Sequence, residues 1–245
     1  MRLPWLDPRD DNQPFPAPDN ALSEPEGLLA AGGNLSPRRL LRAYRLGIFP
    51  WYSSGQPILW WSPDPRLVLF PETVNISRSL RKTLKKKIFT VTTDTVFPAV
   101  IAACAAPRDA DGGTWITPEM SLAYERLHRL GHAHSIESWY EGELVGGLYG
   151  VAVGRVFYGE SMFSTVSDAS KVALAALAVQ LRRWQFTLID CQVRTEHLVR
   201  MGAVEIPRTS FLQLLERYCI QPGRDGRWRF DDDLWTDLLT PATLP

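Results

Sequence analysis

Short apolar runs alternate with amphipathic segments from residue 66 onward. Runs rich in β-branched and aromatic residues predict strands, and apolar positions spaced three or four residues apart predict helices. We expect strands at 66–70, 88–92, 133–139, 143–153, 155–163, 186–192 and 203–207. We expect helices at 77–86, 95–105, 118–130, 168–183, 195–201 and 209–219. The helix at 168–183 is strongly apolar, so it is expected to be buried.

The turns between the predicted strands indicate the fold class. Tyr140-Glu141-Gly142 and Gly154-Arg155 lie between three closely spaced strands, which favours an antiparallel meander. The strands and helices that follow alternate, which adds mixed pairing to the sheet. The predicted fold class is therefore α+β, with a mixed, largely antiparallel sheet flanked by helices.

The N-terminal part of the chain has a different pattern. The first 35 residues are rich in Pro, Gly, Asn and Asp and are expected to form loops. Ser36-Pro37 and Gly47 have the residue types of a helix start and end, which predicts a helix over 37–46. The Pro-rich aromatic segments 47–52 and 60–65 cannot be regular helix. We place a seam there, between a small domain over 1–63 and a larger one over 64–245.

Composition places the chain among ordinary globular proteins. Of its 245 residues, 45% are hydrophobic and 22% charged, and the net charge is zero. No apolar run approaches the roughly 18 residues of a membrane span, and the first residues lack the apolar core of a signal peptide. Three widely spaced cysteines argue against a disulfide framework and a zinc site. We expect a cytoplasmic protein that needs no membrane.

The positive charges are concentrated in one place. Between Thr73 and Thr93 the sequence has six basic residues and no acid. Helical spacing puts four of them on one face: Arg78, Arg81, Lys82 and Lys85. A solvated helix face usually mixes charges of both signs, so this pattern favours contact with phosphates.

Two predicted strands carry polar residues that could do chemistry. In strand 186–192, alternation puts Asp190 and Gln192 on one face and Cys191 on the other. Such a pair could orient an amine, or could only cap a neighbouring loop. In strand 155–163, Glu160 shares a face with Met162 and Ser164 by the same rule. A glutamate among apolar residues is costly unless it is paired, functional or at a sheet edge.

Other candidates are weaker on residue type alone. Trp51 and Trp115 lie in predicted loops, where they could fill packing gaps or clamp a nucleobase between their rings. His128 and His132 are separated by the helix-ending Gly131 and no Cys or acid completes a ligand set, so no metal is expected. Cys191 lacks a histidine partner, which disfavours it as a nucleophile.

The ordered set of motifs resembles the leucyl/phenylalanyl-tRNA–protein transferase family. The resemblance covers about residues 21–210, and its motifs are specific only as a set. The matching stretches are Gly27-Leu28-Leu29-Ala30, Gly47-Ile48-Phe49-Pro50-Trp51, Trp60-Trp61-Ser62-Pro63-Asp64-Pro65-Arg66, Gly113-Thr114-Trp115-Ile116, Gly131-His132-Ala133-His134-Ser135-Ile136-Glu137, Gly159-Glu160-Ser161-Met162-Phe163-Ser164, Ala169-Ser170-Lys171 and Leu188-Ile189-Asp190-Cys191-Gln192-Val193.

The resemblance implies a fold and a reaction. The fold is a small N-terminal domain followed by a GCN5-related N-acyltransferase-like domain. The reaction moves Leu, Phe or, less readily, Met from aminoacyl-tRNA to an N-terminal Arg or Lys of an acceptor protein. It belongs to N-end rule protein degradation and takes place in the cytoplasm. Neither a cofactor, a metal nor CoA is implied.

The resemblance also implies roles for individual residues. Trp51 and Trp115 would sandwich the terminal adenosine, and Glu160, Asp190 and Gln192 would lie at the reacting ester. Ser164 is expected at the same substrate site. The transferred side chain would be held by Leu148, Phe157, Met162, Leu174, Leu177 and Ile189. The tRNA acceptor stem would be held by the basic helix, through Arg78, Arg81, Lys82, Lys85 and Lys86.

Two features of the sequence depart from this pattern. Leu148 and Leu177 stand where a Met and an aromatic residue are expected, so the pocket stays apolar but differs in shape. Strand alternation also puts Phe157 and Ile189 on faces opposite Glu160 and Asp190. A bulge at Gly159 would put Phe157 and Glu160 on the same face; the conflict between Ile189 and Asp190 stays open.

In the expected mechanism the acceptor amine attacks the activated ester, Gln192 accepts a hydrogen bond from that amine, and Asp190 orients Gln192 or relays the proton. Two other functions fit the same fold class. A CoA-dependent N-acetyltransferase would need a Gly-rich loop before the helix at 168–183, and residues 163–168 contain no glycine. A non-catalytic RNA-binding module would leave Glu160 and Asp190 without a role.

Overall fold

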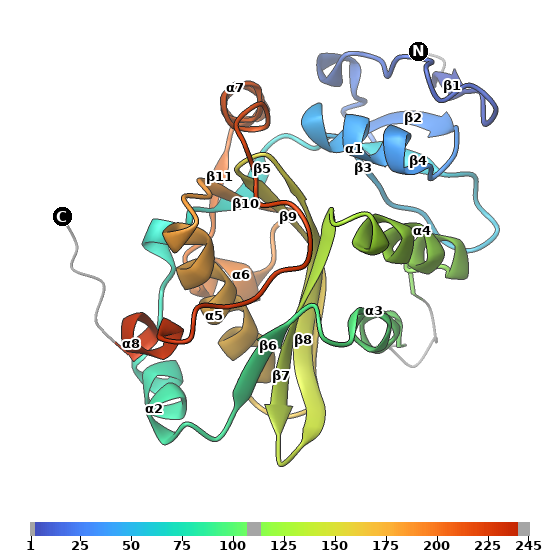
Figure 1. Ribbon diagram of the computed structural model, residues 1–245. Coiled ribbons are helices and arrows are strands. Elements are labelled where there is room, and N and C mark those ends of the chain that lie inside the picture. The colour runs from blue at the N-terminus through green and yellow to red at the C-terminus, as the bar shows by residue number, and fades with distance from the viewer. Residues whose placement is uncertain (1–2, 107–113, 240–245) are drawn as a thin grey trace.

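The computed structural model describes residues 3–106 and 114–239, which form two sheets with helices packed around them (Figure 1). The small sheet has the strand order β1-β2-β4-β3 and the large sheet the order β11-β5-β10-β9-β8-β7-β6. The small sheet consists of β1 (Trp5–Leu6), β2 (Leu28–Gly32), β3 (Phe49–Pro50) and β4 (Leu59–Trp61). The chain passes from the small sheet to the large one after β4.

The small sheet was missed by the sequence analysis, which expected loops over the first 35 residues. Its strands are short, and Pro-rich or Gly-rich segments interrupt them, so no alternation is visible in the sequence. The predicted helix is confirmed as α1 (Pro37–Arg45), where the Ser36 side chain accepts a hydrogen bond from the Arg39 backbone N–H. A short 3-10 helix, η1 (Pro18–Asn20), precedes β2.

The large sheet confirms the predicted meander and fold class. Strands β7, β8 and β9 pair antiparallel in sequence, whereas β10 joins β9 in parallel and β5 in antiparallel orientation. The sheet is therefore mixed and largely antiparallel. Its strands are β5 (Arg66–Leu69), β6 (Thr90–Thr93), β7 (Ala133–Tyr140), β8 (Glu143–Val153), β9 (Val156–Ser164), β10 (Leu188–Gln192) and β11 (Val204–Ile206).

Helices cover both faces of the large sheet (Figure 1). Helices α3 (Phe97–Ala105) and α4 (Pro118–Arg129) pack on one face, and α5 (Ala169–Arg183) packs on the other. The prediction of a buried helix is confirmed, because 12 of the 15 residues of α5 are buried. The remaining helical segments are η2 (Pro71–Thr73), α2 (Arg78–Lys86), α6 (Glu196–Arg200), α7 (Arg208–Tyr218) and α8 (Leu234–Leu239). Among the described helices, none combines the length and apolar character that a bilayer span requires.

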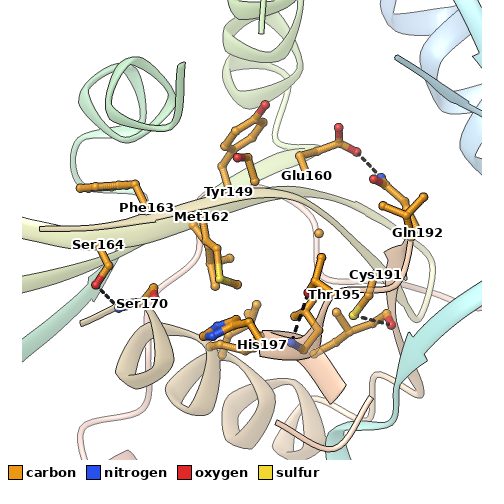
Figure 2. Close-up of a pocket in the computed structure, with 18 of the residues that line it drawn as sticks. Tyr149, Glu160, Met162, Phe163, Ser164, Ser170, Cys191, Gln192, Thr195 and His197 are labelled. Carbon is orange, nitrogen blue, oxygen red and sulfur yellow. Dashed lines mark hydrogen bonds between the residues drawn. The ribbon is translucent and has the colours of Figure 1, made fainter. Parts of the chain in front are cut away.

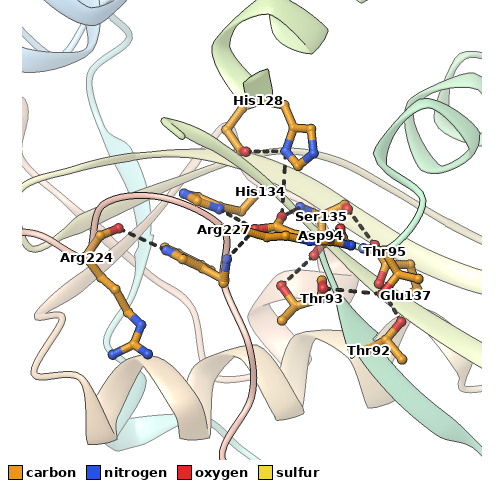
Figure 3. A network of polar contacts seen from close by, with 12 residues as sticks. Thr92, Thr93, Asp94, Thr95, His128, His134, Ser135, Glu137, Arg224 and Arg227 are labelled. Atoms are coloured by element: carbon orange, nitrogen blue, oxygen red, sulfur yellow. Dashed lines mark hydrogen bonds and ion pairs between the residues drawn. The ribbon is translucent and has the colours of Figure 1, made fainter. Parts of the chain in front are cut away.

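The segment after α7 folds back over the large sheet (Figure 3). The buried Trp228 stacks on His134 with 3.7 Å between ring centroids. Its backbone N–H donates to the Asp94 carboxylate at 2.7 Å, which also lies 2.9 Å from the His134 imidazole. Farther along, Arg183 of α5 pairs with the carboxylates of Asp233 and Asp237. These contacts hold α8 against α5 and α2.

Candidate functional site

A cavity opens where two neighbouring strands of the large sheet separate. Strands β9 and β10 are paired only as far as Tyr158 and Asp190. Beyond that point β9 follows β8 to Ser164, while β10 follows β5 to Gln192. A cavity of about 700 Å³ lies at this separation. Side chains from the hydrophobic clusters on both faces of the sheet line it, so the opening passes through the sheet.

Two bulges shape the strands at the cavity. In β9 the register shifts so that Ser161 opposes Tyr149 and Gly159 opposes Gly150, which leaves Glu160 as the extra residue. The site beside the bulge needs a glycine, because a Cβ at Gly150 would collide with the Tyr158 carbonyl oxygen and the Phe157 ring. In β10 a second shift lies between Asp190 and Gln192, and Gln192 adopts a left-handed backbone with φ 62°.

The nine residues expected to bind the substrate all line this one cavity. Leu148 and Met162 face each other across β8 and β9, and Leu174 and Leu177 reach the cavity from α5. Ser164 lies at the N-terminal end of α5, where its hydroxyl accepts the Ser170 N–H at 3.4 Å (Figure 2). We call the apolar part of this wall the recess; it is formed by Leu148, Phe157, Met162, Leu174, Leu177 and Ile189.

Two tryptophans line the same cavity from different parts of the chain. Trp51 follows β3 and is 43% exposed, and its carbonyl oxygen accepts the Trp61 indole N–H at 2.7 Å. Trp115 is half-buried just before α4, whose first turn is capped by the Thr117 side chain. Gly113 of the motif around Trp115 lies outside the described residues. Both indoles are therefore available to a ligand in the cavity.

Glu160 is buried in the cavity wall among hydrogen-bond donors. Its Oε1 accepts the Tyr44 hydroxyl at 2.7 Å and the Gln192 side-chain N–H at 3.1 Å, and its Oε2 accepts the Tyr124 hydroxyl at 2.7 Å. Burial raises the pKa of Glu160 to about 7, the hydrogen bonds from both tyrosines oppose that rise, and the charge of Asp190 adds to it.

The predicted shared face holds for Met162 and Ser164, which both lie on the side of α5, but it is wrong for Glu160. Figure 2 shows Glu160 and Met162 on opposite sides of β9, because the bulge at Glu160 reverses the alternation. Met162 thereby lies on the side of α5 together with Phe157, and Glu160 lies on the side of α4. The bulge predicted at Gly159 therefore exists one residue later and brings Phe157 and Met162 together.

The predicted shared face of Asp190 and Gln192 is also wrong, because the second bulge turns Gln192 and Cys191 toward the cavity. Asp190 does not line the cavity. Its carboxylate is fully buried and accepts two hydrogen bonds from Arg66, at 2.8 and 2.6 Å. It also accepts the Gln192 backbone N–H at 2.9 Å. Asp190 thus fixes the backbone of Gln192 from behind the cavity wall.

Helix α2 presents the expected cations to solvent. Arg78, Lys82, Lys85 and Lys86 are exposed, whereas Arg81 donates to the Leu239 carbonyl oxygen of α8 at 3.1 Å. Ser77 caps the helix. The helix is connected to the cavity through the Thr83 hydroxyl, which donates to Asp168 at 2.9 Å. Asp168 immediately precedes α5, whose Ser170 lines the cavity.

Several residues at the site were missed by the sequence analysis. His197 of α6 lines the cavity, and its buried Nε2 has no hydrogen-bond partner among the described residues. Arg66, Tyr44 and Tyr124 contact Asp190 or Glu160 from elements that are distant in the sequence. Of these residues, only Arg66 could have been found from the sequence: it stands at the start of an apolar strand, and a buried cation requires an anionic partner.

Other chemistry receives little support from the described residues. No group of three or more His, Cys, Asp and Glu side chains in residues 3–106 and 114–239 has the arrangement of a metal site. Cys191 lies in the cavity wall, but burial and the neighbouring Asp190 raise the pKa of its thiol. A raised pKa keeps the thiol protonated, which makes it a poor nucleophile.

Comparison with known proteins finds two adjoining family matches. The family described as leucyl/phenylalanyl-tRNA protein transferase matches residues 68–216. The N-terminal domain of the same family matches residues 33–64.

Curated relatives match over nearly the whole chain. A leucyl/phenylalanyl-tRNA–protein transferase of Nitrosomonas europaea is 60% identical over 89% of this chain and 92% of its own. One from Azoarcus sp. is 60% identical over 92% of this chain and 95% of its own. Among solved structures, a GCN5-related N-acetyltransferase from Kribbella flavida is 14% identical over 69% of this chain and 60% of its own. Its TM-score of 0.32 is too low to support an argument from fold.

Proposed function

The chain belongs to the leucyl/phenylalanyl-tRNA protein transferase family and is therefore an aminoacyltransferase that uses aminoacyl-tRNA and protein substrates; from this premise we propose its specific reaction. The enzyme moves Leu or Phe, and less readily Met, to the N-terminal Arg or Lys of acceptor proteins. We assign this reaction to N-end rule protein degradation in the cytoplasm.

One observation carries the proposal: a single cavity is lined by aromatic, apolar and polar side chains of the kinds that an aminoacyl-adenosine requires. Trp51 and Trp115 supply aromatic faces for the terminal adenosine. The recess supplies an apolar surface for the transferred side chain. Glu160 and Gln192 lie in the same wall and supply polar atoms for the ester and the attacking amine. An aminoacyl-adenosine combines a base, an apolar side chain and a polar ester, and the cavity wall has a matching surface for each of them.

The reaction needs positioning more than activation. An aminoacyl ester is already reactive toward an amine, and holding the two groups together can contribute several kcal/mol. Gln192 donates its side-chain N–H to Glu160, which leaves its amide oxygen to accept a hydrogen bond from the amine. We assign Asp190 as a positioning residue, because it holds the Gln192 backbone and faces away from the cavity.

An acceptor peptide tests the reaction and separates it from both alternatives. The protein is incubated with a peptide beginning in Arg and with Leu-tRNA, with acetyl-CoA, or with neither. We expect the peptide to gain the mass of one leucyl residue only with Leu-tRNA. A gain of one acetyl group would support an N-acetyltransferase instead. No product in any tube, with tRNA still bound, would support a non-catalytic RNA-binding module.

We assign the exposed cations of α2 to the tRNA backbone. Replacing Lys82, Lys85 and Lys86 with alanine should weaken tRNA binding and lower the slope of log affinity against log salt by roughly one per lost phosphate contact. Binding is measured by filter retention over a range of salt concentrations. A triple variant of exposed arginines outside α2, Arg9→Ala, Arg38→Ala and Arg45→Ala, is the matched control. An equal change of slope in both triple variants would remove the assignment.

A further inference from the structure

Three short contacts join the oxygen atoms of Tyr44, Tyr124 and Glu160, but the two tyrosine hydroxyls can donate only two hydrogen bonds. The Tyr44 and Tyr124 hydroxyls lie 2.7 Å apart, and each lies 2.7 Å from one oxygen of the Glu160 carboxyl group. These are three short contacts between oxygen atoms, and each needs one proton. Two phenols supply two protons. The third contact is filled when Glu160 itself is protonated.

The surroundings of the cluster allow Glu160 to exist both as a neutral acid and as a carboxylate. Glu160 is 8% exposed and both tyrosines are almost fully buried, so desolvation favours the neutral acid. The side-chain N–H of Gln192 and the two hydroxyls favour the carboxylate. The other facing groups are Tyr149 of β8 and the Asp190 carboxylate, whose negative charge also favours the neutral acid although Asp190 is paired with Arg66.

The same arrangement leaves Glu160 as the acid that faces the substrate cavity. Asp190 is held by Arg66 behind the wall, whereas Glu160 lines the cavity beside Gln192. An amine that reaches the amide oxygen of Gln192 therefore lies next to the Glu160 carboxylate. The hydrogen bonds of Tyr44 and Tyr124 can rearrange when that carboxylate takes up one proton.

We propose that Glu160 accepts a proton from the α-ammonium group of the acceptor protein, with Tyr44 and Tyr124 as positioning residues that hold its carboxylate in the cavity wall. This inference rests on the proposed function. The ammonium group gives one proton to the Glu160 carboxylate. The resulting amine attacks the ester carbon, the new C–N bond forms and the C–O bond to the ribose breaks. A second proton leaves the nitrogen for the departing ribose oxygen, and Glu160 returns its proton to solvent.

A Glu160→Gln variant tests the proposal through the pH dependence of a single turnover. An α-amino group has a pKa of roughly 7.7–8.0, so about 5% of the acceptor is already neutral at pH 6.5. About a quarter of Glu160 is ionised at pH 6.5 in the wild type, so we expect transfer by Glu160→Gln to be reduced about 5-fold at that pH and to approach the wild-type rate at pH 9, where the amine needs no base. The rates are measured with saturating Leu-tRNA and corrected for hydrolysis of the ester without enzyme.

A conservative variant of the cluster gives a second readout. Tyr44→Phe removes a hydrogen bond that favours the Glu160 carboxylate, so the pKa of Glu160 rises and the pH profile of transfer should move to higher pH. Tyr158→Phe is the matched control, since the buried Tyr158 hydroxyl donates to the Tyr44 carbonyl oxygen and does not contact Glu160. The control profile should stay in place.

The outcomes separate this inference from the proposed function. A wild-type protein that transfers no leucine would overturn the proposed function. If the wild type transfers leucine but the defect of Glu160→Gln is the same at every pH, the carboxylate has only a structural role and the inference is overturned. A Tyr44→Phe profile that coincides with the Tyr158→Phe profile would remove Tyr44 from the cluster's function.

Discussion

Replacing Arg66 with alanine is expected to lower the free energy of unfolding by about 3–5 kcal/mol, because it leaves the fully buried Asp190 carboxylate without its counter-charge. The guanidinium group also lies between the Phe49 and Phe211 rings, 4.8 and 4.7 Å from their centroids. It donates to the Gly47 carbonyl oxygen at 3.2 Å as well. One side chain therefore connects the N-terminal part, β10 and α7. Urea denaturation followed by circular dichroism measures the change.

A charge-neutral pair provides the control for this prediction. Arg66→Met combined with Asp190→Asn removes both charges, so it should be more stable than Arg66→Ala alone. Arg9→Ala, at a surface arginine whose side chain is 89% exposed, should change the free energy of unfolding by less than about 1 kcal/mol. If Arg66→Ala were no more destabilising than Arg9→Ala, the buried pair would not carry the stability assigned to it.

Removing both cavity tryptophans should have the largest effect on transfer. If Trp51 and Trp115 each stack on the terminal base, each alanine substitution costs about 1–3 kcal/mol of binding, or roughly 5-fold to 150-fold in affinity. We expect the double variant to lose kcat/KM for Leu-tRNA by roughly the product of the two single losses. The measurement is the initial rate of leucine transfer at low Leu-tRNA concentration.

The chain offers a matched control for loss of an indole. Trp5 of β1 is 63% exposed and does not line the cavity, so Trp5→Ala should leave kcat/KM nearly unchanged. The recess is untouched in the tryptophan variants, so the preference between Leu-tRNA and Phe-tRNA should also remain. Single variants that transfer leucine as fast as Trp5→Ala would show that the rings do not hold the nucleobase.

The large sheet was predictable because β7, β8 and β9 have 8, 11 and 9 residues with turn residues between them, and its shorter strands alternate along the chain with helices. Each strand from β5 to β11 and each helix from α2 to α7 falls within a few residues of its predicted position. The small sheet was not predictable, because a strand such as Phe49–Pro50 has two residues and no period. Helix α8 was also missed, since its six residues owe their stability to α5 and α2 rather than to local propensity.

The site was predictable as a set of residue types but not as a geometry. Trp51, Trp115 and the six recess residues were expected together and lie together. Strand alternation failed at Glu160 and Gln192, because a bulge depends on pairing with another strand; Gly159 indicated the first bulge to within one residue, and nothing in the local sequence indicated the second. The pairing of Asp190 with Arg66 joins residues far apart in the chain, so no spacing rule could reveal it.

The separation of β9 and β10 has a consequence for how specificity can change. Beyond Tyr158 and Asp190, the two strand edges that face each other have no strand partner on that side within residues 3–106 and 114–239, so main-chain N–H and C=O groups border the cavity. Side-chain substitutions can reshape the recess around Leu148 or Leu177, but they cannot delete these main-chain groups. Substitutions in the recess can therefore change which side chain fits the cavity, while the main-chain groups along the two strand edges stay the same.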